Sequence, residues 1–209
     1  MSMVEEIRRH YHQALLEYTS GEHYETLLEA KEEYFVLTGK LLEEDDDYES
    51  RMNGFNDWYL LHFVSRKAIR TPIKNYIIKY GVNEVVEKAL QNVNHSLFEY
   101  LGEDSRKHIV IMDAIASKKY VISDAHLMPT FIKGDMFIGR LVSDEGRFYL
   151  LDGQTVLPKD VKLLLKKEAK RIGQFDDPHR QWSFLVTLEN LKTRWKRYGH
   201  IDADKIFTF

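Results

Sequence analysis

Two charged residues interrupt apolar runs in the second half of the chain. Asp113 lies within IVIMDAIASKKYVI, and Arg140 lies within FIGRLV. A charge buried in an apolar interior needs a partner, so the two form a possible buried polar pair. If both lined one cleft, Asp113 could serve as the general base of a hydrolase. The alternatives are that Asp113 lies at a strand end or in a hairpin turn and that Arg140 lies on the surface.

Basic residues cluster in two segments near the C-terminus. The first cluster is Lys166, Lys167, Lys170 and Arg171, and the second is Lys192, Arg194, Lys196 and Arg197. Trp195 and Tyr198 accompany the second cluster, and cations beside aromatic rings suit phosphate backbones and stacked bases. These eight residues are therefore possible nucleic-acid or anion contacts. The alternative is that they form the solvated faces of two amphipathic helices whose aromatic residues face the core.

The number and spacing of histidine and cysteine residues do not predict a metal site. The chain has no cysteine, which excludes disulfides, thiolate zinc sites and a cysteine nucleophile. His10 and His12 are two residues apart and face different sides of a helix. Glu6 and His10 have the spacing of four that helical metal sites use, but one such pair is common by chance. We expect no catalytic residue, no metal and no cofactor.

Charge is distributed unevenly along the chain. The net charge is −3, yet residues 1–50 carry 14 acidic and 4 basic side chains, whereas residues 158–200 carry 11 basic and 5 acidic ones. The two ends should attract each other, within one molecule or between two.

The N-terminus does not resemble a signal peptide, and no apolar run approaches the roughly 20 residues that span a bilayer. We expect a cytoplasmic protein without a membrane partner.

Apolar spacing predicts helices at residues 4–18, 23–42, 52–63, 72–80 and 84–93. Between the second and third helices the run EEDDDYES predicts a solvated break, because like charges repel one another. Thr71, Pro72 and Gly81 have the residue types of a helix start and stop, and Asn83 can cap the next helix.

From residue 95 the pattern changes to strands. SLFEYLG is a short strand, and two hairpins follow, the first turning near Ser117 and Lys118 and the second at SDEG. Gly134 and Asp135 predict a turn, and Gly139 predicts a bulge or a close approach by another strand. Helices are expected again at residues 158–173 and 181–198.

Segregated helices and antiparallel hairpins predict an α+β protein. Its parts are a helical region at residues 1–94, a small antiparallel β-barrel-like or sheet module at 95–157, and C-terminal helices at 158–209 that pack on the rest.

Several motifs resemble those of a known group of proteins. In order, they are FNDWYLLHF, TPIKNYI, SLFEYL, the single aspartate in IVIMDAIASKKYVI, FIKGDMFIGRLV, GRFYLLDGQTVLP and the closing RYGHIDADKIF. The order is similar to that of uncharacterised bacterial proteins related to the region preceding the SEC-C zinc motif, over about residues 55–209. The resemblance implies a helical segment followed by a small β-barrel-like module, and it supplies no catalytic residue. The cysteine-rich SEC-C motif itself is absent, so zinc is not implied.

These observations favour a non-enzymatic binding or adaptor protein of the bacterial cytoplasm. The acidic N-terminal helical part would be the protein-interaction surface, for a protein partner or for self-association. The alternative is a nucleic-acid-binding module that uses the β module and the basic C-terminal helices. Salt dependence of binding would separate the two hypotheses.

Overall fold

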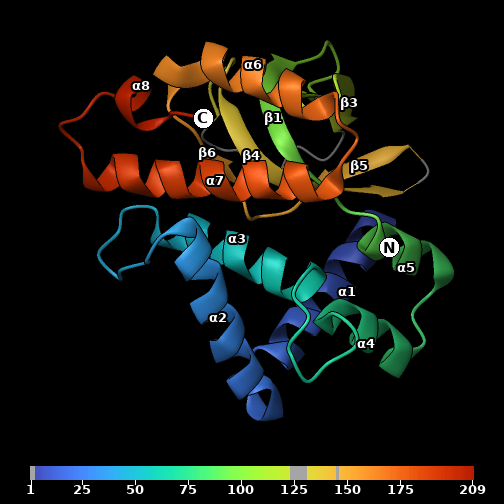
Figure 1. Cartoon of the computed structure of the whole chain (residues 1–209). Coiled ribbons are helices and arrows are strands. Elements are labelled where there is room, and N and C mark those ends of the chain that lie inside the picture. Colours follow the sequence, from blue (N-terminus) through green and yellow to red (C-terminus); the bar gives the residue numbers. More distant parts are fainter. Residues whose placement is uncertain (1–2, 123–130, 145) are drawn as a thin grey trace.

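The chain begins with helices, continues with an antiparallel sheet and ends with helices, which confirms the predicted α+β class (Figure 1). The computed structural model describes residues 3–122, 131–144 and 146–209. The N-terminal helices are α1 (Met3–Tyr18), α2 (Tyr24–Thr38), α3 (Tyr48–Leu61), α4 (Pro72–Tyr80) and α5 (Glu84–Gln91), with a short 3-10 turn at Gly21–His23 before α2. The C-terminal helices are α6 (Lys162–Gly173), α7 (Pro178–Arg197) and α8 (Ala203–Ile206), with a 3-10 turn at Lys159–Val161 before α6.

The sheet lies between these two groups of helices in the sequence. Its strands are β1 (Asn94–Glu103), β2 (Ile109–Asp113), β3 (Lys118–Ile122), β4 (Met136–Asp144), β5 (Arg147–Leu150) and β6 (Thr155–Val156). The spatial order is β3-β2-β1-β4-β5, β6 pairs with β4, and all pairs are antiparallel. The sheet curls into a half-barrel, and Tyr120 of β3 packs edge-on against Phe148 of β5 at 4.9 Å between ring centroids.

Local signals set several helix ends. Gly81 follows α4 with a left-handed φ of 59°, and the Asn83 side chain accepts a hydrogen bond from the Val85 backbone N–H at 2.8 Å. Thr71 occupies the N-cap position of α4, but its hydroxyl does not cap the helix, which corrects the sequence prediction. Helix α7 starts at Pro178, three residues before the predicted start, because Asp177 accepts hydrogen bonds from the first-turn amides.

The predicted turns occur where the strands need them. Gly134 has a φ of 96°, and the Asp135 carboxylate accepts a hydrogen bond from the Ile132 backbone N–H at 2.8 Å, which confirms the turn before β4. Ser117 turns the first hairpin with a φ of 54°. The predicted SDEG turn includes Glu145, which lies outside the described residues, and the strands on either side are antiparallel.

The strand register assigns side chains to two faces of the sheet. Phe98 lies opposite Asp113 on one side and Phe137 on the other, so these three residues share the concave face. A separate apolar cluster fills that face: Phe98, Ile109, Ile111, Tyr120, Ile122, Phe137, Leu141 and Leu150. Gly139 is close to Leu150 of β5, since a Cβ atom there would lie 3.4 Å from the Leu150 side chain, and the β1–β4 register has no bulge at that position.

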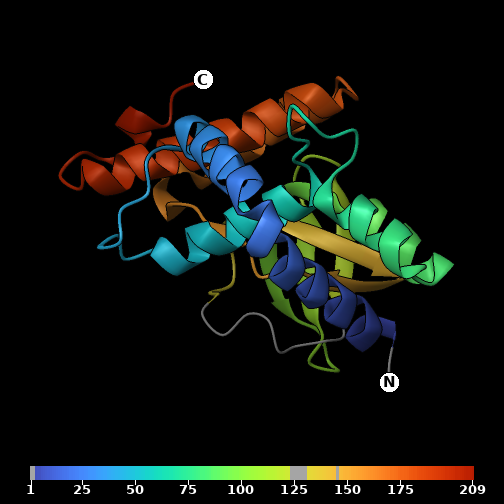
Figure 2. The ribbon, with the colours of Figure 1, turned by 90° about the horizontal axis from the view of Figure 1, so that it is seen from below.

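The opposite face of the sheet is covered by both groups of helices. Met136 and Ile138 of β4 belong to the cluster formed with α6 and α7, whereas Val142 belongs to the cluster formed with α1–α5. Seen from below, α1, α3 and α4 lie in front of the strands (Figure 2). Arg140 lies between these positions on β4, at the seam where the two helical groups meet.

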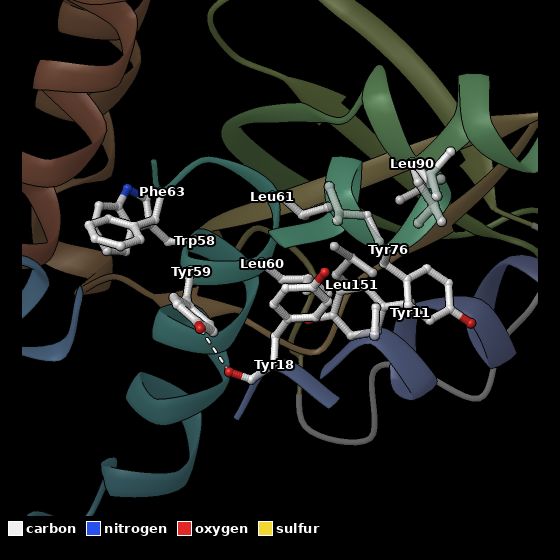
Figure 3. Packing of buried hydrophobic residues seen from close by; sticks show 14 of the residues in the cluster. Tyr11, Tyr18, Trp58, Tyr59, Leu60, Leu61, Phe63, Tyr76, Leu90 and Leu151 are labelled. Atoms are coloured by element: carbon white, nitrogen blue, oxygen red, sulfur yellow. Dashed lines mark hydrogen bonds between the residues drawn. The ribbon is translucent and has the colours of Figure 1, made fainter. Parts of the chain in front are cut away.

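The core of the N-terminal helices is rich in aromatic side chains. The Tyr59 hydroxyl of α3 donates a hydrogen bond to the backbone carbonyl of Tyr18 at 2.7 Å and so ties α3 to the end of α1 (Figure 3). Tyr59 is fully buried and Phe63 is 3% exposed.

No helix in the described part of the chain is long and apolar enough to cross a membrane.

Candidate functional site

Asp113 is a turn aspartate of the β2–β3 hairpin. Its Oδ1 accepts hydrogen bonds from the Ser96 hydroxyl at 2.7 Å and from the backbone N–H groups of Ile115 and Ala116 at 2.9 Å each. Its Oδ2 accepts one from the Asn94 amide at 2.9 Å. Because these donors satisfy both oxygens and the residue is 1% exposed, the carboxylate has a structural role.

The predicted pairing of Asp113 with Arg140 is wrong. Asp113 shares the concave face with Phe137, and Arg140 lies three residues beyond Phe137 on the same strand. Side chains alternate between faces along a strand, so Arg140 points to the opposite face. The two residues therefore do not line one cleft, and a hydrolase site built on them is excluded.

Arg140 contacts the N-terminal helices instead. Its side chain is 1% exposed, and Nη1 lies 3.9 Å from Oδ2 of Asp57 and 3.5 Å from the backbone carbonyl of Gly54. Asp57 also accepts hydrogen bonds from the Tyr11 hydroxyl and from the Gly153 backbone N–H. Burial raises the pKa of Asp57 to about 6, and the Arg140 guanidinium opposes that rise.

A second carboxylate belongs to the same seam. Tyr34 of α2 donates a hydrogen bond to Oε2 of Glu189 on α7 at 2.6 Å. Burial raises the pKa of Glu189, and its hydrogen bond from Tyr34 and the charge of Arg140 oppose the rise. The buried polar seam (Tyr11, Tyr34, Asp57, Arg140 and Glu189) thus joins α1, α2, α3, β4 and α7. All five residues are at most 9% exposed, so the seam fixes the packing of helices against the sheet.

Sequence reasoning missed Asp57, although a signal was present. Asp57 interrupts the aromatic run FNDWYLL in the same way that Asp113 interrupts its strand.

The second basic cluster is joined to the acidic segment, defined as residues 43–47. Lys192 Nζ lies 2.7 Å from Asp47 Oδ2, and Lys196 Nζ lies 2.7 Å from Asp46 Oδ2. Arg197 donates a hydrogen bond to the backbone carbonyl of Lys40. The predicted break between α2 and α3 is present, and Glu43, Glu44 and Asp46 are exposed as expected. Helix α7 nevertheless neutralises part of this segment, so the two ends of the chain attract each other within one molecule.

The acidic segment also contacts the start of α3. Asp45 Oδ2 lies 3.3 Å from Nη1 of Arg51, whose guanidinium also donates to the carbonyls of Gly39 and Lys40. Helix α3 begins at Tyr48, directly after this segment.

The first basic cluster is paired in part. Lys166 and Lys162 lie 2.6 and 2.8 Å from the Glu99 carboxylate, and Arg171 lies 2.7 Å from Glu168. Burial opposes the effect, yet the two ammonium groups hold the pKa of Glu99 below its ordinary value. Of the eight predicted contacts, four are exposed and form no ion pair within the described residues: Lys167, Lys170, Arg194 and Arg197.

The aromatic neighbours of the second basic cluster differ in exposure. Trp195 is half-buried against the C-terminal core, whereas Tyr198 is 49% exposed. Trp195 and the Lys192 and Lys196 side chains line a groove of about 750 Å³ beside the acidic segment. The lysine charges in the groove are balanced by Asp46 and Asp47, so it has no clear preference for an anion.

Helix α2 carries carboxylates that remain unpaired. Its buried residues, Ala30, Tyr34 and Thr38, follow one stripe, and the opposite side is the α2 outer face: Glu25, Leu28, Glu29, Glu32, Glu33 and Val36. Leu28 is 42% and Val36 is 75% exposed. Glu29 lies 3.8 Å from Arg66, whereas Glu25, Glu32 and Glu33 form no ion pair within the described part of the chain.

No three residues of the types His, Cys, Asp or Glu gather to hold a metal ion within residues 3–122, 131–144 and 146–209. Comparison of the chain with protein-family models, curated proteins and solved structures found no match. The resemblance to the region preceding the SEC-C motif therefore stays a prediction.

Proposed function

We propose that the chain is a non-enzymatic binding protein that engages a basic protein partner through the α2 outer face. The observation that carries the proposal is the combination of three unpaired carboxylates, Glu25, Glu32 and Glu33, with exposed Leu28 and Val36 on one helix face. Apolar side chains bordered by like charges suit a partner with complementary charge and an apolar contact at its centre. The bacterial cytoplasm is the proposed location.

The pairing of the basic clusters supports this choice over the nucleic-acid alternative. Lys192 and Lys196 are held by carboxylates of the acidic segment, and Lys166 is held by Glu99. A nucleic acid would have to compete with these carboxylates at Lys166, Lys192 and Lys196, which leaves about half of the predicted contacts for phosphates without such competition. The carboxylates of the α2 outer face need no such exchange, since Glu25, Glu32 and Glu33 have no ion-pair partner to give up among the described residues.

Point variants test the proposal better than deletion, because Tyr11 of α1 and Tyr34 of α2 belong to the buried polar seam. The tagged protein is used to capture partners from a lysate of the source cell, with and without nuclease. Triple charge reversal, E25K/E32K/E33K, should lower recovery of a basic protein about tenfold or more, because attraction becomes repulsion at three exposed positions.

A control variant carries the same number of charge reversals at positions away from α2. Glu84, Glu87 and Glu103 are reversed to lysine in that variant, since they lie on α5 and β1 away from α2. Recovery should stay within about twofold of the wild type, as expected for surface changes outside an interface. Equal loss in both triple variants, or recovery that disappears on nuclease treatment, contradicts the proposal.

A further inference from the structure

A pocket of about 270 Å³ lies between the start of α2, the end of α3 and the start of α4. Its aromatic lining comes from Tyr18, Tyr59 and Phe63, of which Tyr59 is fully buried. Tyr59 belongs to the last turns of α3 and Phe63 follows the end of that helix, and Figure 3 shows the Tyr59 hydroxyl directed at the Tyr18 carbonyl. The hydrogen bond fixes the Tyr59 ring, so this wall of the pocket is pre-formed.

The charged residues that line the pocket are basic. Lys67 and Arg70 come from the loop that joins α3 to α4, and His23 comes from the turn before α2. Lys67 and Arg70 are exposed and form no ion pair within the described residues. His23 stacks on Tyr18 at 4.2 Å between ring centroids and lies 3.7 Å from Glu22, so the argument depends on Lys67 and Arg70.

The start of α4 adds further hydrogen-bond donors beside the pocket. Pro72 and Asn75 of its first turn line the pocket, and Thr71 at the N-cap gives no side-chain cap to the first-turn amides. Thr71 is 7% exposed and does not itself line the pocket, whereas the hydroxyl-bearing residues Thr26 and Ser65 do. A helix start attracts negative charge, so the first turn of α4 favours an anion in the pocket.

We infer that this pocket binds the phosphate group of a small phosphate monoester. An arginine, a lysine, hydroxyl groups and a helix N-terminus are the donors that phosphate uses in proteins. The aromatic wall would contact the apolar or planar part of the molecule, and the volume limits that part to about one ring. The pocket lining lacks a carboxylate, although residues 1–50 as a whole are strongly acidic.

Isothermal titration calorimetry with phenyl phosphate, in a buffer free of phosphate and sulfate, tests the inference. The wild type should bind one equivalent. Arg70→Gln and Lys67→Gln should each weaken binding about tenfold or more, the usual effect of losing a hydrogen bond to a charged group. Both side chains are exposed, so both variants should keep the wild-type thermal midpoint.

A matched control and two further ligands make the outcome decisive. Arg106→Gln removes the same charge on the β1–β2 turn, outside the pocket, and should leave the affinity within about twofold of the wild type. Absence of saturable heat with both phenyl phosphate and inorganic phosphate overturns the inference. Affinity for benzoate equal to that for phenyl phosphate overturns the phosphate assignment. If Arg106→Gln weakens phenyl phosphate binding as much as Arg70→Gln does, net charge alone sets the affinity, and the inference is overturned.

Nuclear magnetic resonance locates the bound ligand independently of affinity. The Nε–Hε signal of Arg70, assigned by its absence from the Arg70→Gln spectrum, should move as phenyl phosphate is added. Binding that leaves this signal unchanged places the ligand elsewhere and contradicts the inference.

Discussion

The ammonium nitrogen of Lys192 lies 2.7 Å from Oδ2 of Asp47, and the two side chains are 8% and 16% exposed. This contact fastens the longest helix, α7, to the acidic segment between α2 and α3. The neighbouring contact of Lys196 with Asp46 has the same length but is more open, at 38% and 75% exposure. Two ion pairs of equal length on one helix should therefore differ in their contribution to stability.

Lys192→Met should lower the free energy of unfolding by roughly 1–3 kcal/mol, because Asp47 is left without its cation in a partly closed site. Lys196→Met should lower it by less than about 0.5 kcal/mol, as is usual for exposed pairs. Urea denaturation followed by circular dichroism measures both. Equal effects of the two substitutions would show that the difference in burial has no energetic consequence.

Arg140 should be energetically coupled to Asp57. Arg140→Met should lower the free energy of unfolding by roughly 3–5 kcal/mol, because the buried carboxylates lose their cation. Adding Asp57→Asn should restore part of that loss, so the double variant should be more stable than the sum of the single changes predicts. Denaturation of the four proteins in this cycle gives the coupling. Simple additivity would mean that the 3.9 Å contact carries no interaction energy.

The raised pKa of Asp57 predicts an unusual dependence of stability on pH. A carboxyl group with a pKa near 6 in the folded state, against 3.8 ordinarily, holds its proton more tightly when folded. Its contribution to stability is complete below about pH 4 and is lost as the pH rises to about 6. The free energy of unfolding of the wild type, relative to Asp57→Asn, should fall by roughly 1–3 kcal/mol across that window.

The comparison with Asp57→Asn is needed because other carboxyl groups act in the opposite direction. Contacts with lysine hold the pKa of Glu17, Asp46 and Glu99 below the ordinary value, so their stabilisation is lost as the pH falls. These contributions cancel in the difference between the two proteins. A difference that stays constant from pH 4 to pH 6 would contradict the raised pKa of Asp57.

Asp113 should matter for stability through its hydrogen bonds. Asp113→Ala removes the acceptor for Ser96, Asn94 and two backbone amides, and should cost roughly 2–4 kcal/mol. Asp104→Ala is the matched control in the β1–β2 turn, since Asp104 also accepts backbone hydrogen bonds but its side chain is 32% exposed. Its cost should be about half as large or less, because water can replace the lost acceptor. Thermal unfolding of both variants compares them.

Much of the fold could be predicted because its signals are local. The range 72–80 of α4 and the turn at Gly134 follow from proline, glycine and apolar spacing within a few residues. The error over Asp113 and Arg140 has a different origin. Each residue interrupts an apolar run, which does not tell which face of the sheet it occupies. The faces follow from strand pairing: Phe98 of β1 lies opposite Asp113 of β2 and Phe137 of β4.

The ion-pair partners of the acidic segment could not be predicted for a related reason. Repulsion within EEDDDYES is a local property, whereas its partners Lys192 and Lys196 lie about 150 residues away in the sequence. The charge asymmetry predicted attraction between the two ends of the chain, but not which residues meet. The unpaired carboxylates of the α2 outer face could be identified only after the paired ones had been assigned.

Site-specific photocrosslinking at Val36 tests whether the α2 outer face is the interface. A photoreactive phenylalanine analogue replaces Val36, which is 75% exposed, and in a second protein it replaces Leu163 of α6, which is 82% exposed. Irradiation in cells of the source organism should join a basic protein to position 36, with or without nuclease, and not to position 163. Crosslinks of equal yield at both positions, or none at position 36, would contradict the proposed binding function.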